Sequence, residues 1–267
     1  MIWTFLFVGA AAVVYFGMLN TKLMDVSDDS DGVVNNGAYV VLSLIPCTAF
    51  FKKHTIIQFL LWAVILMAII FSVKRGAILI SSVAFFVYIW RSMSSAKRFK
   101  RVVVASLSVV SLLVVFNYAQ YLFENTTLLS KRLYATLEGD SSERNLIFAS
   151  YSQFFFSESS IFELIFGHGA YGTLHYLGIM AHNDWLELAI DMGLLGVSLY
   201  LIYWIMVWKM AYNSRKECSE EIFTAILLFA VLYFSSSFFS MSIMRMPLFA
   251  TVPFGFCIGQ YLNTVQK

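Results

Sequence analysis

IFTAILLFAVLYFSSSFFSMSI, the stretch Ile222–Ile243, contains no charged residue. About 20 apolar residues in a helix cross the hydrocarbon core of a bilayer. Similar runs recur along the chain, and Ile2–Leu19 counts among them because it lacks the basic leader of a signal peptide. We therefore expect about eight spans: Ile2–Leu19, Ala38–Phe51, Ile56–Val73, Ala77–Trp90, Val102–Tyr121, Gly193–Trp208, Ile222–Ile243 and Pro247–Leu262.

Composition supports this fold class. Of 267 residues, 60% are hydrophobic and 13% charged, and the mean hydropathy is +0.75. Soluble domains carry about 25% charged residues, so an integral membrane protein is predicted. The net charge of +2 argues against nucleic-acid binding, and three distant cysteines without a CxxC motif predict neither disulfides nor a zinc ribbon. The sequence predicts one all-α membrane domain, residues 1–267, folded as a polytopic helical bundle.

Basic residues indicate the orientation of the spans. With both termini in the cytoplasm, the cytoplasmic segments hold eleven of the eighteen basic residues and three of the sixteen acidic ones. Such an excess of Lys and Arg marks the cytoplasmic side. We expect a multi-pass protein of a bacterial cytoplasmic (inner) membrane. One large loop, residues 122–186, would lie outside the cytoplasm and carry the active site.

Seven basic residues remain on the outer side, against the positive-inside rule. Arg75 lies in a tight connection between two apolar runs, FSVKRGAIL, and Arg245 lies between two others. Either could be a snorkelling side chain that anchors a helix end. Alternatively, arginines that converge on one outer pocket would bind a diphosphate, because guanidinium groups pair bidentately with phosphate oxygens. The candidates are Arg75, Arg132, Arg144 and Arg245.

The outer loop also contains three of the four histidines. Residues 144–166 are rich in aromatic and aliphatic side chains, which predicts helices in the membrane interface. His182 lies where a polar helix start, HNDWLEL, leads into a span. It is a candidate general base for a hydroxyl group, and the alternative is a structural histidine that caps the helix. Asp184 or Glu187 would orient its imidazole.

A metal site is the weaker reading of these histidines. His168, His175 and His182 recur every seven residues, but the glycines between them disfavour one continuous helix, and no HExxH motif occurs. We predict no metal and no cofactor.

Four segments together resemble the O-antigen polymerase and ligase family of bacterial envelope glycosyltransferases. They are KRGAIL at Lys74–Leu79, SSER at Ser141–Arg144, GHGAYG at Gly167–Gly172 and HNDWLELAIDMGLLG at His182–Gly196. The resemblance covers roughly Ile56–Gly259 and is most specific in the last segment. Members of that family have ten or more spans, so a short or N-terminally truncated member is expected.

The resemblance implies a C-type glycosyltransferase fold and a metal-independent transferase that uses an undecaprenyl-diphosphate-linked glycan. By position, Arg75 and Arg144 resemble the family's diphosphate-binding arginines, and His182 resembles the residue that assists the acceptor hydroxyl. The expected function is an O-antigen or polysaccharide polymerase in lipopolysaccharide biosynthesis, inverting at the anomeric carbon. A chain-length regulator and a flippase would be further partners.

Two alternatives stay open at this point. An O-antigen ligase, which attaches finished glycan to lipid A–core, carries the same motifs. A polysaccharide or solute transporter is the alternative of another class. Transporters often show internal repeats and broken helices near the midplane, and the sequence contains no recognisable inverted repeat.

Overall fold

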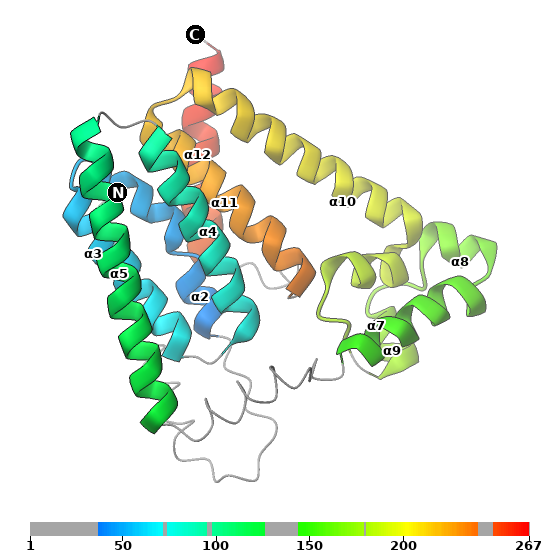
Figure 1. Cartoon of the computed structure of the whole chain (residues 1–267). Helices are drawn as coiled ribbons and strands as arrows, with labels where there is room; N and C mark the ends of the chain where they lie inside the picture. Colours follow the sequence, from blue (N-terminus) through cyan, green and yellow to red (C-terminus); the bar gives the residue numbers. More distant parts are fainter. Residues whose placement is uncertain are drawn as a thin grey trace. The chain divides into compact units, whose positions relative to one another are not determined.

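The computed structural model describes residues 37–71, 74–94, 98–125, 144–178, 180–239 and 248–266. Regular structure in these residues is helical throughout, without a strand (Figure 1). The chain divides into two compact units, which are described separately. The first unit comprises Met1–Leu129, Ala211–Leu232 and Met246–Lys267, and the second comprises Ser130–Met210 and Tyr233–Arg245. The expected span Ile2–Leu19 lies outside the described residues.

The first unit is built around α3 (Thr55–Phe71), a helix of apolar residues. It contacts the helices that are nearest in sequence, α2 (Gly37–Leu42), η1 (Ile45–Phe51), α4 (Arg75–Ser94) and α5 (Arg98–Asn125). Trp62 of α3 is fully buried, and its ring lies 5.3 Å from Tyr88 and 5.1 Å from Phe85 of α4. Large aromatic rings thus form the contact between these two helices.

The apolar run Ala38–Phe51 forms two short helical pieces. α2 ends at Leu42, and the 3-10 helix η1 follows with Pro46 near its start. Proline has no backbone N–H to continue a helical ladder, so a break at this point is expected. The amide Nε2 of Gln58 donates to the carbonyl of Thr48 at 2.9 Å. This buried bond satisfies a backbone acceptor, as apolar surroundings require.

An ion-pair cluster joins three elements of the first unit. Glu220, at the start of α11 (Glu220–Phe239), accepts bonds from Lys52 at 2.8 Å and from Arg91 at 2.5 Å. The Arg91 guanidinium also lies 4.7 Å from the ring centre of Phe223. The distribution of Lys and Arg along the sequence predicts that Lys52, Arg91 and Glu220 lie on one side of the membrane. In the structure their side chains are in contact.

Four helical segments in the described residues are long and apolar enough to cross a membrane: Gly76–Ser94, Arg101–Tyr118, Asp184–Glu217 and Glu220–Phe239. They support a polytopic membrane protein. The total of eight spans, the side of each loop and the position of the termini stay predictions. Of the other expected spans, Ile56–Val73 corresponds to α3, and Pro247–Leu262 corresponds to α12 (Leu248–Val265).

Candidate functional site

The second unit contains the described part of the expected outer loop. Its elements are α7 (Arg144–Gln153), the π-helix η2 (Phe154–Glu158), α8 (Ile161–Phe166), α9 (Gly172–Leu177) and most of α10 (Asp184–Glu217). Figure 1 shows the short helices gathered around the first turns of α10. A buried cluster holds them there, made of Tyr151, Phe154, Phe155, Ala181 and Ile190. The loop sequence therefore folds onto the helix that follows it.

α10 is kinked at Gly193, whose φ of 64° and ψ of −164° are not helical. In the turn before the kink, the carbonyl of Ile190 accepts the N–H of His168 at 2.7 Å, and that of Asp191 accepts the N–H of Gly169 at 3.0 Å. In a regular helix these two carbonyls would bond to the N–H groups four residues later. We call this contact of residues 165–169 with residues 190–193 the backbone crossing.

Two glycines make the backbone crossing sterically feasible. A Cβ atom on Gly167 would lie 2.4 Å from the carbonyl oxygen of Asp191, and its φ is +81°. A Cβ atom on Gly193 would lie 2.4 Å from the carbonyl oxygen of Ile165. Only glycine permits both the positive φ and this approach. The glycines of two separate sequence motifs thus face one another across the same contact.

Two buried carboxylates on α10 hold the segment 171–182. Asp191 accepts the backbone N–H groups of Tyr171 at 3.1 Å and Thr173 at 3.3 Å. Glu187 accepts the Thr173 hydroxyl and the N–H of Ala181, each at 2.5 Å. The backbone N–H of the next residue, His182, also helps to stabilise the ionised carboxylate of Glu187. We call Glu187 and Asp191 with these donors the carboxylate clamp. Buried carboxylates need such partners, and here the donors come from the loop backbone.

Tyr151 of α7 lies near the carboxylate clamp. Burial raises the pKa of Tyr151 to about 12, and the negative charges of Glu187 and Asp191 add to this rise. A tyrosine phenol with its ordinary pKa of about 10 is already neutral at physiological pH, and the raised pKa of Tyr151 keeps it neutral in more alkaline solution as well.

His182 directly follows Ala181, a donor of the carboxylate clamp. Its side chain is exposed, and its backbone adopts a left-handed φ of 53° between buried Ala181 and the start of α10. Such a conformation is costly for a residue other than glycine and is often found at functional sites. The helix cap is supplied by Asn183, whose Oδ1 accepts the N–H groups of Trp185 at 2.9 Å and Leu186 at 3.2 Å. The capping role considered for His182 is thus taken by its neighbour.

The two acids expected to orient the imidazole lie in different surroundings. The carboxylate of Glu187 interacts with the backbone N–H of His182. Asp184 is buried and accepts the hydroxyl of Tyr200 at 2.9 Å, a bond between the first residue of α10 and a residue further along it. An orienting role of either acid toward the ring stays a prediction.

The described residues do not test whether the four candidate arginines converge. Arg75 is the first residue of α4 in the first unit, and Arg144 is the first residue of α7 in the second. Arg132 and Arg245 lie outside the described residues. Their convergence with His182 stays a prediction.

His168 occupies a separate, buried environment. Its ring lies between Phe154 at 4.8 Å and Tyr176 at 5.0 Å, and its Nε2 is 2.8 Å from the Ser159 hydroxyl. Its Nδ1 is 3.5 Å from Glu163. Among the described residues, no group of three or more His, Cys, Asp and Glu side chains is arranged to hold a metal.

Thr173, Asn183 and Asp191 were not anticipated from the sequence as part of the site. The spacing of Glu187 and Asp191, four residues apart, places both on one helix face and was the available signal. Nothing in the sequence indicated their partners, which are mostly backbone N–H groups.

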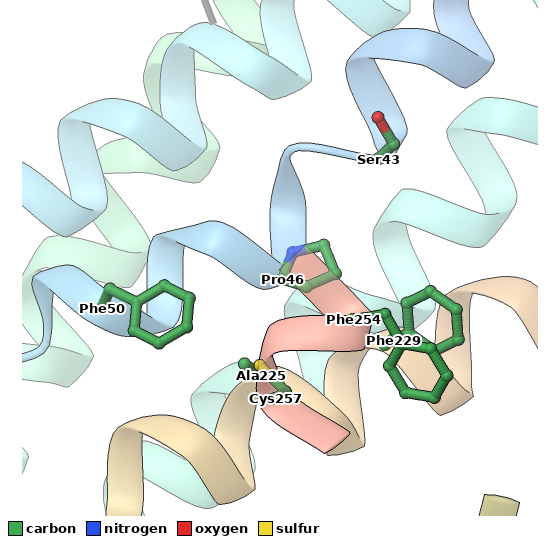
Figure 2. A pocket seen from close by; sticks show the side chains of 7 residues that line it. All are labelled: Ser43, Pro46, Phe50, Ala225, Phe229, Phe254 and Cys257. Carbon is green, nitrogen blue, oxygen red and sulfur yellow. The ribbon is translucent and has the colours of Figure 1, made fainter. Parts of the chain in front are cut away.

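A pocket in the first unit differs chemically from this site (Figure 2). Its lining is almost wholly apolar: Ser43, Pro46, Phe50, Ala225, Phe229, Phe254 and Cys257. The Ser43 hydroxyl donates to the carbonyl of Val40 at 2.5 Å. No charged group lines this pocket, so it is unsuited to a diphosphate.

Comparison with known protein families, with curated proteins and with solved structures finds no match to this chain.

Proposed function

We propose that the chain is a polysaccharide polymerase of the bacterial cytoplasmic membrane. It would transfer a glycan from an undecaprenyl-diphosphate carrier to a hydroxyl of a lipid-linked repeat unit at the outer face. One observation supports this above the others: the exposed, left-handed His182 directly follows Ala181, whose backbone N–H donates to buried Glu187. A solvent-accessible imidazole suits a general base, which must reach the hydroxyl of an incoming substrate.

The proposed reaction is a single displacement. The acceptor oxygen forms a bond to the anomeric carbon, the bond from that carbon to the diphosphate breaks, and His182 takes the hydroxyl proton. The lipid diphosphate leaves with the electron pair and gains negative charge. Arg75 and Arg144, with Arg132 and Arg245, would stabilise this charge. The configuration at the anomeric carbon inverts, and neither a metal nor a cofactor takes part.

The ligase stays the alternative within the resembled family, since it differs only in the acceptor. Purified protein in proteoliposomes, given lipid-linked repeat units, should form products of increasing length. Attachment to lipid A–core in place of elongation would identify a ligase. If the protein moved glycan across the membrane without forming a new linkage, the transporter alternative would be correct.

The role of His182 is tested by His182→Ala beside His175→Ala. Both histidines have exposed side chains, but the backbone N–H of His175 bonds within its own helix and not to the carboxylate clamp. We expect His182→Ala to reduce transfer at least a hundredfold, in the range of general-base catalysis, and His175→Ala to leave it unchanged. Full activity of His182→Ala at equal protein level would contradict the proposal.

A further inference from the structure

α8 presents an apolar face that the second unit does not cover. Ile161 is 78% exposed, Phe162 69%, Ile165 42% and Phe166 50%. These positions recur at helical spacing on one face, and the rings of Phe162 and Phe166 lie 4.8 Å apart. On the other side of α8, Leu164 packs against the buried cluster of the unit. The helix is therefore anchored by one face and exposes the other.

Exposed apolar residues also lie on α10 next to the backbone crossing. Ile165 meets Gly193 there, and the neighbouring Met192, Leu194 and Leu195 are 50%, 52% and 49% exposed. We call the seven exposed residues the outer apolar patch: Ile161, Phe162, Ile165, Phe166, Met192, Leu194 and Leu195. Beyond it, residues 194–208 of α10 contain no charge and belong to a candidate span. The patch is thus continuous with a surface suited to lipid.

Length places the membrane boundary on α10. The 24 residues beyond the kink, 194–217, form a helix about 36 Å long, which is enough to cross the roughly 30 Å of a bilayer core without the turns before the kink. From Leu194 to Tyr212 the helix covers about 28 Å, with Lys209 near the far end able to snorkel. Glu187 and Asp191 precede Gly193, which agrees with a boundary at the kink.

We propose that the side chains of the outer apolar patch insert into the outer leaflet. α8 would lie along the membrane surface, and Gly193 would lie at the edge of the hydrocarbon core. α8 has six residues and is about 9 Å long, far too short to cross a bilayer. Its capping box, in which Ser160 and Glu163 exchange bonds, satisfies backbone donors at the helix start. A short, capped helix with a bare apolar face fits a bilayer interface. The proposal does not depend on the enzymatic reaction.

Site-directed spin labelling of the full chain in phosphatidylethanolamine and phosphatidylglycerol nanodiscs tests this placement. Cys218 is replaced by Ser, whereas Cys47 and Cys257 are buried and stay. Nitroxides are then attached to Phe162→Cys, Phe166→Cys and Leu195→Cys. His175→Cys, exposed on α9, is the matched control, and the background protein with Cys218 replaced measures residual labelling.

We expect oxygen to relax the labels at Phe162, Phe166 and Leu195 more strongly than a water-soluble nickel complex, most strongly at Leu195. The control label should favour nickel. Nickel access at Phe162 and Phe166 equal to that at His175 would place the face in water and overturn the proposal. Low access of both reagents would show a protein partner on the face, and would overturn it equally. Two positions on α8 keep the test valid if one variant misfolds.

Discussion

Gly193 lies against the carbonyl of Ile165 so closely that a Cβ atom on it would be 2.4 Å from the oxygen. Gly193→Ala must therefore separate the backbone crossing and also strain a positive φ. We expect a loss of about 2 kcal/mol or more in the free energy of unfolding, measured by thermal denaturation in detergent. Gly255→Ala is the matched control, because a Cβ atom there meets nothing within 4 Å. An equal effect of both substitutions would contradict the account of the kink.

Glu187→Gln should loosen the carboxylate clamp. The amide has one acceptor oxygen where the carboxylate has two, each of which accepts a bond at 2.5 Å. Leaving one buried donor without an acceptor costs about 1–3 kcal/mol. We expect a lower melting temperature, together with a kcat that falls more than the KM for the lipid-linked donor changes. Thr173→Ser keeps the hydroxyl and should retain activity, whereas Thr173→Val should not. Equal activity of the two Thr173 variants would exclude the bond to Glu187 as a positioning contact.

Glu220→Gln should weaken the junction of η1, α4 and α11. The side chain of Glu220 is 44% exposed, so solvent screening limits the expected loss to at most about 1 kcal/mol despite the short bonds to Lys52 and Arg91. The melting temperature should fall at low ionic strength, and the difference from the unsubstituted protein should shrink in salt. Glu221→Gln controls for the removal of a charge at the same helix end. A loss that persists undiminished in salt would contradict an ionic origin.

Chelation tests the predicted metal independence. We expect transfer activity in proteoliposomes to be unchanged after dialysis against a strong chelator, because arginines would carry the stabilisation of the leaving diphosphate. Loss of activity that added Mg²⁺ or Zn²⁺ restores would contradict this prediction.

Apolar runs predicted where helices form better than where they end. The run Ala77–Trp90 lies inside α4, which extends from Arg75 to Ser94, and Val102–Tyr121 lies inside α5. Apolar composition marks the part of a helix suited to lipid, whereas backbone hydrogen bonding continues into polar residues at both ends. The difference is largest on α10. Its expected span begins at Gly193, but the helix starts at Asp184 because Asn183 caps it.

The candidate site could be predicted only in part for a related reason. His182 stood out because of its chemistry and its place before a span. The groups that fix it are mostly backbone N–H donors of residues 171–182, and every residue other than proline carries one. Their geometry depends on the kink and on the crossing chain, and no local pattern specifies it.

The carboxylate clamp and the kink lie on one uninterrupted run of α10, which has a consequence for length variation. One inserted residue between Glu187 and Gly193 would rotate Glu187 by about 100° relative to the kink, and the clamp and the crossing could not form together. Homologous chains should therefore keep the interval from Glu187 to Gly193 constant.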